Sequence, residues 1–163
     1  MSYWLMKSEP DEASIDHALA LKEKGIPWTG VRNYQARNFM RDQMRIGDGV
    51  LFYHSSCEQP GIAGIAEVAS DSYPDPTQFD PQSPYFDPKS VSEQPRWLLV
   101  DVRALKKTRL ISLAELREQP ELQEMLILRR GNRLSITPVT QTEWDCIVNK
   151  LVNIVLNQPV NKK

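Results

Sequence analysis

The residues best suited to binding a ligand lie together between Trp28 and Asn38. This stretch holds an indole, a phenol, three carboxamides and two guanidiniums, with too few aliphatic side chains to belong to a core. Aromatic rings offer flat apolar faces, amides pair donors with acceptors, and arginine supplies a planar cationic fork. This set of groups predicts a site for a flat heterocycle attached to a phosphate.

The charge of the chain restricts where such a ligand can bind. A net charge of −1 excludes the overall basic surface of a strongly basic nucleic-acid binder, so a nucleic-acid site must be local. Arg37, Arg41 and Arg45 recur at a spacing of four, which on a helix places them along one face. A solvated face with Asp42 as local partner is the competing interpretation. Further basic clusters are Lys106-Lys107-Arg109 and Arg129-Arg130-Arg133.

Length and composition predict an ordinary globular protein. The chain has 163 residues, of which 40% are hydrophobic and 25% charged, so we expect one domain over residues 1–156 and a disordered tail over 157–163. Apolar runs are short and no signal peptide is recognisable, which predicts a soluble cytoplasmic protein. Cys57 and Cys146 are too few for a disulfide scaffold or a four-ligand zinc site, and we expect reduced thiols, no metal and no cofactor.

Short elements of uneven length are expected to position the ligand-binding segment. The first half of the chain predicts strands over residues 3–6, 50–54 and 61–68, with a bulge or close backbone approach at Gly61 and Gly64. Helices are predicted from Ser14 to Leu21 and over 36–45, the second with Phe39 and Met40 inward.

Seven of the 12 prolines lie between residues 60 and 95 and predict a long extended loop. Its rings, Tyr73, Phe79, Tyr85 and Phe86, favour an ordered excursion pinned by aromatic contacts over a mobile loop. The elements expected after it are a strand over 96–102, a helix after a Ser112 and Glu115 capping box, a helix over 121–128, a strand over 134–136 and an amphipathic helix over 140–156. Without a regular βαβ rhythm, these elements predict an α+β fold around a small mixed barrel.

Six sequence blocks resemble the EVE domain family in consistent order. They are residues 3–10, 28–38, 51–56, 73–79, 95–97 and 133–135, and the likeness spans nearly the whole chain. The resemblance implies a PUA-like fold, a curved mixed β-barrel flanked by helices. It also implies a non-catalytic domain that reads a modified base of DNA or RNA. In duplex DNA the base would be turned out of the stack, whereas unstacked RNA bases are read at less cost.

The resemblance carries specific roles over to this sequence. It implies a pocket between the residues at the end of the first strand, the 28–36 loop, the 53–55 segment, Trp97 and the 133–135 segment. The predicted base-binding residues are Ser8, Glu9, Trp28, Asn33, Tyr34, Gln35, Tyr53, His54, Ser55, Trp97, Leu134 and Ser135. The predicted phosphate-binding residues are Lys7, Arg32, Arg37, Arg41 and Arg133. We expect the partner to be DNA or RNA and favour a monomer.

Structural and enzymatic alternatives stay open at this point. Trp4 and Trp97 lie in alternating strands and suit a core, and Glu9 before Pro10 can simply cap a turn. His54 is followed by Ser55, Ser56 and Cys57, which places a base near nucleophiles as in a hydrolase, although closeness in sequence is weak evidence. An interaction module would instead use the proline-rich loop as a peptide-like surface.

Overall fold

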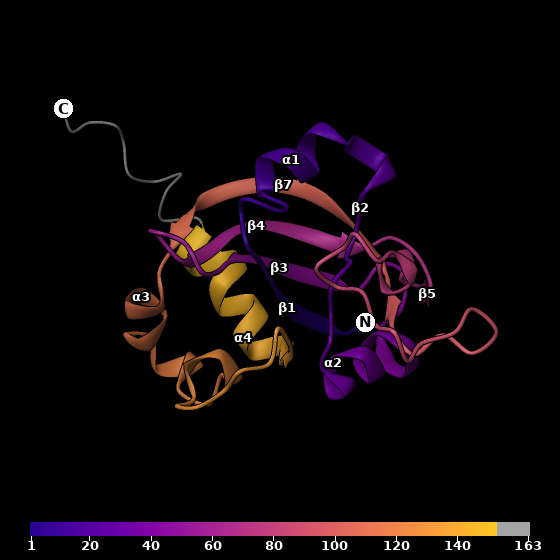
Figure 1. The fold of residues 1–163 in the computed structure, drawn as a ribbon. Coiled ribbons are helices and arrows are strands. Elements are labelled where there is room, and N and C mark those ends of the chain that lie inside the picture. The colour runs from indigo at the N-terminus through magenta and orange to yellow at the C-terminus, as the bar shows by residue number, and fades with distance from the viewer. Residues whose placement is uncertain (153–163) are drawn as a thin grey trace.

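A curved mixed sheet forms the centre of the protein, for which the computed structural model describes residues 1–152 (Figure 1). Six strands hydrogen-bond in the order β2-β7-β4-β3-β1-β8, and β5 and β6 form a separate antiparallel pair. Within the large sheet only β1 and β3 are parallel neighbours. The strands are β1 (Tyr3–Ser8), β2 (Ile26–Pro27), β3 (Gly49–His54), β4 (Gly61–Val68), β5 (Tyr73–Pro74), β6 (Leu98–Leu99), β7 (Asp101–Ile111) and β8 (Ile136–Val139).

Short helices cover both faces of this sheet. The α-helices are α1 (Ile15–Ala20), α2 (Tyr34–Asn38), α3 (Leu113–Arg117) and α4 (Gln141–Asp145). π-Helices continue two of them over Phe39–Gln43 and Cys146–Leu151, and 3₁₀ turns occupy Lys22–Lys24, Pro76–Phe79, Pro120–Leu122 and Leu126–Leu128. Within residues 1–152, none of the helices combines the length and apolar character that crossing a membrane requires.

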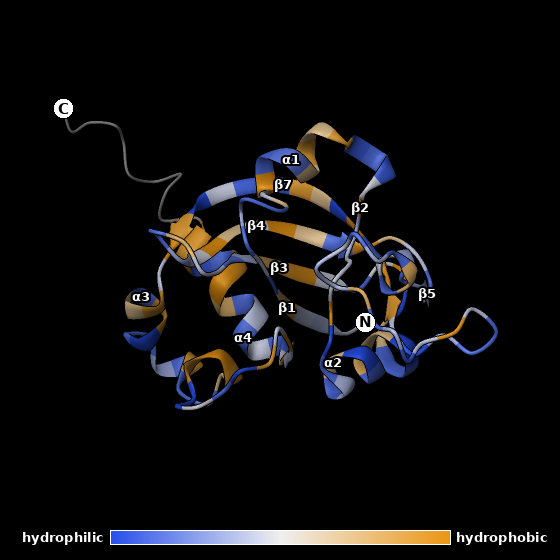
Figure 2. Ribbon diagram, viewed as in Figure 1, coloured by the Kyte–Doolittle hydropathy of each residue, from blue (hydrophilic) through white to orange (hydrophobic). Residues whose placement is uncertain are grey.

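The two faces of the sheet carry separate hydrophobic clusters because side chains alternate along each strand. One cluster includes Trp4, Met6, Val50 and Phe52 with residues of α1 and α2, and the other includes Leu5, Leu51 and Tyr53 with residues of α3 and α4. Figure 2 shows the hydrophobic residues gathered on the strands. The α+β class and the mixed barrel predicted from the sequence are confirmed, with the barrel as an open half-barrel.

The glycines of β4 allow the close backbone approach that the sequence predicted. A Cβ at Gly61 would lie 2.5 Å from the carbonyl oxygen of Ile111, and one at Gly64 would lie 2.8 Å from that of Lys106. The pairing of β4 with β7 shifts register between Ile62 and Gly64, and again between Ile65 and Ala66. A side chain at either position would therefore push the two strands apart.

The predicted helix over 36–45 is wrong in its bounds and in its geometry. It starts at Tyr34, because the Asn33 side chain accepts a hydrogen bond from the backbone N–H of Ala36 at 3.0 Å and caps it. After Asn38 the α-helix becomes a π-helix that ends in extended backbone at Met44. Arg45 lies beyond this end, so the arginine row is not one straight helix face.

The C-terminal half differs from expectation at three further places. Residues 121–128 form two 3₁₀ turns instead of a helix, because the extended backbone of Met125 separates them. Ser112 caps α3, but the Glu115 side chain pairs with Arg109 and does not complete a capping box. The strand expected over 134–136 is β8, which runs to Val139 and contains Pro138, as an edge strand tolerates.

The strand expected over 96–102 is likewise divided. Leu98–Leu99 belongs to β6, and β7 starts at Asp101 and continues to Ile111. The extension of β7 to Ile111 was not predicted, because Lys106 and Lys107 form a basic run and such a run does not indicate a strand. The two lysines are tolerated because both side chains are exposed, β2 pairs only with the first two residues of β7, and Lys107 forms an ion pair with Asp16 of α1.

The proline-rich excursion is pinned by buried polar side chains together with two of its predicted rings, since the hydroxyls of Tyr73 and Tyr85 donate to Asp101 and Glu12. Asp75 and Gln78 are fully buried, whereas Tyr73 and Phe86 are exposed. The amide nitrogen of Gln78 donates to the carbonyl oxygens of Asp75 and Trp97, both at 2.7 Å. The tail expected over 157–163 and the last turn of the expected C-terminal helix lie outside the described residues.

Candidate functional site

A cavity of about 400 Å³ opens where the carboxyl end of β1 meets the segment after β2. Seven of the sequence-predicted site residues line it: Lys7, Ser8, Glu9, Trp28, Ser55, Arg133 and Ser135. Further lining residues that the predicted sets did not contain include Glu12, His17, Thr29, Gly30, Ser56 and Tyr85.

The parallel pairing of β1 with β3 brings these distant segments together. It sets Ser8 opposite His54, so the residues that follow each strand leave the sheet at the same edge. The Ser55 N–H donates to the carbonyl oxygen of Ser8 at 2.9 Å, and the Lys7 N–H donates to that of Ser135 at 2.8 Å. Backbone hydrogen bonds therefore hold three walls of the cavity in fixed positions.

Three charged side chains at the cavity are not committed to other groups. Lys7, Glu9 and Arg133 make no side-chain hydrogen bond or ion pair within residues 1–152. Burial lowers the pKa of the half-buried Lys7 ammonium. A partly desolvated ammonium without a partner is stabilised by an anionic or hydrogen-bonding ligand, since buried polar groups in proteins are otherwise paired.

The turn after β1 is built to leave the Glu9 carboxylate free. The backbone carbonyl of Glu9 accepts hydrogen bonds from the N–H groups of Glu12 at 2.9 Å and Ala13 at 3.0 Å. The Ser8 hydroxyl donates to the carbonyl oxygen of Ala13 at 2.6 Å. Backbone groups and Ser8 thus close the turn, and the Glu9 side chain is not needed as a cap.

The two predicted stacking residues lie in different places. Trp28 lines the cavity but is only 6% exposed, and its ring meets Phe52 edge-on with centroids 5.2 Å apart. Tyr34 is half exposed and stacks on the buried Trp97 at 4.7 Å, outside the cavity lining. The Trp97 indole donates to Asp87 at 2.8 Å. Trp4 and Trp97 are both buried, as the core interpretation predicted.

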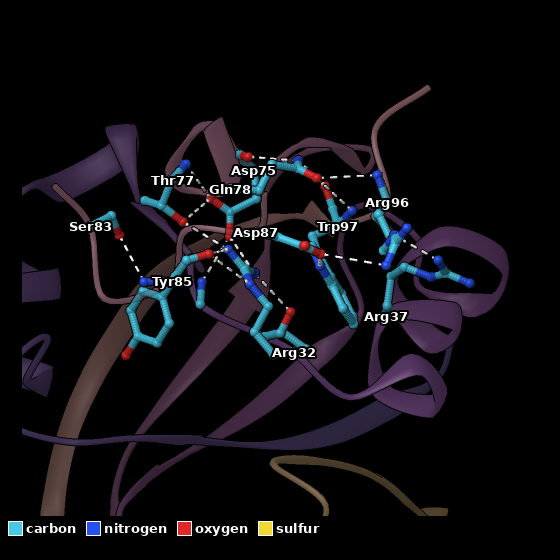
Figure 3. A network of polar contacts seen from close by, with 12 residues as sticks. Arg32, Arg37, Asp75, Thr77, Gln78, Ser83, Tyr85, Asp87, Arg96 and Trp97 are labelled. Atoms are coloured by element: carbon cyan, nitrogen blue, oxygen red, sulfur yellow. Dashed lines mark hydrogen bonds and ion pairs between the residues drawn. The ribbon is translucent and has the colours of Figure 1, made fainter. Parts of the chain in front are cut away.

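Arg32 belongs to an internal network shown in Figure 3. Its guanidinium pairs with the fully buried Asp75 at 3.1 Å and donates to Thr77 at 3.0 Å and to the backbone carbonyl of Tyr85 at 2.8 Å. It does not line the cavity. The donors of this arginine are therefore used to fasten the proline-rich excursion to the segment after β2.

The remaining residues of the aromatic and amide-rich segment are also placed outside the cavity. Asn33 caps α2 and Gln35 is exposed on it. Arg37 donates to the carbonyl oxygen of Arg96 at 2.9 Å and to Asn38 at 2.7 Å. The exposed Arg41 pairs with Asp42 at 2.8 Å, which agrees with the solvated-face interpretation.

The predicted residues around the ends of β3 and β8 divide between two cavities. Tyr53 is buried in the core, and Leu134 is half buried outside the lining. His54 accepts a hydrogen bond at Nε2 from the Ile15 N–H at 3.1 Å and lines a second cavity together with Cys57. Because Ser55 and Ser56 line the first cavity, the structure does not bring the imidazole together with either hydroxyl.

Tyr85 and Glu12 are functional candidates that the sequence did not identify. The Tyr85 hydroxyl donates to both carboxylate oxygens of Glu12, at 2.7 and 2.8 Å. Burial, and then this hydrogen bond, raise the pKa of Tyr85 to about 12. The two residues are 73 positions apart in the sequence. The aromatic ring of Tyr85 was therefore the one signal in the sequence that pointed to a binding role.

Comparison with known proteins places this chain in a family. The chain matches the model of the EVE domain over residues 2–150. Human thymocyte nuclear protein 1 is 42% identical over 166 residues, which cover 91% of this chain and 73% of the human protein. A crystal structure of a Pseudomonas putida protein is 49% identical with a TM-score of 0.85, covering 90% of this chain and 97% of that one.

A second solved structure comes with a nucleic acid. Human THYN1 in complex with 5-methylcytosine-containing DNA is 41% identical with a TM-score of 0.85, covering 91% of this chain and 96% of that one. These matches confirm the family and the PUA-like fold that the sequence blocks indicated. The chain is a member of the EVE domain family.

Proposed function

We propose that this chain is a non-catalytic DNA-binding domain that recognises a modified cytosine by taking the everted base into the cavity beside Lys7, Glu9 and Arg133. The observation that carries the proposal is that three charged side chains around one cavity of about 400 Å³ have no side-chain partner in the described part of the chain. The binding of 5-methylcytosine-containing DNA by the related human THYN1 supports the choice of ligand.

The cavity offers chemistry for each part of a nucleotide. The Glu9 carboxylate can accept a hydrogen bond from the exocyclic amine of cytosine, and the hydroxyls of Ser55 and Ser135, which line the cavity, can serve its other edge atoms. The cationic groups of Lys7 and Arg133 suit the phosphates on either side of an everted nucleotide. Taking the base out of the duplex exposes all of its hydrogen-bonding edge to these groups.

The positions of His54, Ser55 and Ser56 support a binding role over hydrolysis by a serine hydroxyl. A serine hydrolase needs its base within hydrogen-bonding distance of the hydroxyl, and here Nε2 of His54 is engaged by the Ile15 N–H. The hydroxyls of Ser55 and Ser56 lie at the other cavity. The base and phosphate roles of Tyr34, Gln35, Arg37 and Arg41 stay predictions, because these residues lie apart from the cavity lining.

The test is an equilibrium titration of the full chain against matched duplexes that differ only in one 5-methylcytosine. Single-stranded DNA and RNA of the same sequence complete the set. We expect tighter binding to the methylated duplex, and a salt slope of about −0.9 for each phosphate contacted. Equal binding to all duplexes would contradict recognition of the modification, and preference for the RNA would reassign the partner.

A further inference from the structure

Tyr85 bridges two walls of the candidate cavity. It comes from the proline-rich excursion, yet its hydroxyl is bonded to Glu12, which lies in the turn after β1. Figure 3 shows its ring leaving the polar network on the side away from Trp97. The ring is half buried and lines the cavity beside Thr29 and Gly30.

The backbone of Tyr85 is held as firmly as its hydroxyl. Its carbonyl oxygen accepts hydrogen bonds from Nε of Arg32 at 3.1 Å and from Nη2 at 2.8 Å. Its N–H donates to the Ser83 hydroxyl oxygen at 3.0 Å. Because Arg32 is itself anchored on the buried Asp75, both ends of the tyrosine are fixed before any ligand arrives.

Gly30 provides the space in which the ring rests. Its φ is +86°, and a Cβ built on it would lie 2.6 Å from Cζ of Tyr85. A side chain at this position would displace the ring from the cavity wall. The Tyr85 ring therefore occupies this position only because residue 30 has no side chain.

We propose that Tyr85 is the residue on which the everted base stacks, and that Glu12 and Gly30 position its ring. This inference rests on the proposed function and names the stacking surface of that site. Trp28, the stacking residue expected from the sequence, is 6% exposed and packs against Phe52, so it has little free face. Tyr85 presents a ring that loses little conformational freedom when a base stacks on it.

The experiment compares Tyr85→Ala, Tyr85→Leu and Tyr85→Phe on two duplexes. One contains 5-methylcytosine and the other an abasic site at the same position. We expect Tyr85→Ala and Tyr85→Leu to weaken binding to the methylated duplex about 5- to 150-fold, which is the range for one stacked base. Binding to the abasic duplex should be nearly unchanged, and Tyr85→Phe, which keeps the ring, should lose much less.

Phe86→Ala is the matched control, because it removes an exposed aromatic ring of the same loop that does not line the cavity. It should leave both affinities as they are. Thermal unfolding confirms that each variant is folded, and Tyr85→Leu keeps bulk at the wall if Tyr85→Ala unfolds. An equal loss on both duplexes, or no loss on either, would overturn the stacking role. If the unaltered chain does not prefer the methylated duplex, the proposed function itself fails.

Discussion

Arg32 and Asp75 form an ion pair at the base of the proline-rich excursion, with Nη1 and Oδ2 3.1 Å apart and the carboxylate fully buried. The same Oδ2 accepts a hydrogen bond from the Gly30 N–H at 2.8 Å. One buried carboxylate thereby fixes both the segment after β2 and the excursion that carries Tyr85. Arg32, which lies in the 28–38 segment, therefore stabilises the cavity wall without lining the cavity itself.

Asp75→Asn should lower the free energy of unfolding by about 3 kcal/mol, the scale found when one partner of a buried ion pair is removed. The amide would present an N–H₂ group to a site that now faces the donors of Gly30, Arg32 and Thr77. Chemical denaturation measures the change. Asp42→Asn is the control, because Asp42 pairs with Arg41 at the surface and should leave the denaturation midpoint in place.

Arg133→Ala should weaken DNA binding and reduce the magnitude of the salt slope by about 0.9, as the loss of one phosphate contact does. Arg133 lies at the cavity without a partner in the described part of the chain. Arg41→Ala makes the same substitution at a guanidinium that Asp42 already neutralises. Titrations at several salt concentrations give the salt slope of each variant. A larger change of slope for Arg41→Ala would favour phosphate binding by the arginine row predicted from the sequence.

The sequence predicted the parts of this protein that depend on local pattern. Runs of bulky and β-favouring residues at 3–6 and 50–54 indicated strands, and the glycines at 61 and 64 indicated a close approach. The mixed α+β fold followed from the irregular order of these elements. Motif order then identified the family, which the comparisons confirm.

The positions of the site residues could be predicted only in part, because they depend on partners far away in the sequence. Composition alone treats Arg32 and Arg133 alike, but Arg32 pairs with Asp75 whereas Arg133 has no side-chain partner among residues 1–152. The sequence predicts Trp28 as a stacking residue, but in the structure its ring packs against Phe52. Tyr85 reaches the cavity through a carboxylate 73 residues away, a contact that no local pattern encodes.

Binding should weaken at alkaline pH through Lys7. Burial lowers the pKa of the free ammonium, whereas a bound phosphate raises it, so binding takes up a proton between these two pKa values. Affinity therefore falls as the pH rises through that window. Tyr85, with its pKa raised to about 12 by burial and by Glu12, keeps its proton.

The measurement for Lys7 is the dissociation constant from about pH 7 to about pH 10, where lysine begins to lose its charge. Lys7→Arg is the control, because a guanidinium stays protonated throughout this range and should flatten the curve. The same fall in affinity for both proteins would show that another group titrates.

Comparing Gly30→Ala with Gly47→Ala distinguishes the effect of backbone strain from the effect of displacing the Tyr85 ring. Both glycines have positive φ, +86° and +95°, so each alanine should cost about 1 kcal/mol of folding free energy. A Cβ at Gly47 meets nothing within 4 Å, whereas one at Gly30 collides with the Tyr85 ring. Only Gly30→Ala should also weaken DNA binding, as measured by titration, and equal binding by both variants would argue against a fixed ring.

The most direct test of base recognition fills the cavity with a large side chain and measures the preference for a methylated over an unmethylated duplex. Ser135→Trp adds an indole at the lining, and Gln35→Trp adds the same group at an exposed position of α2. We expect Ser135→Trp to abolish the preference while salt-sensitive binding remains, and Gln35→Trp to keep the preference. A preference that survives in Ser135→Trp and disappears in Gln35→Trp would contradict base recognition in this cavity.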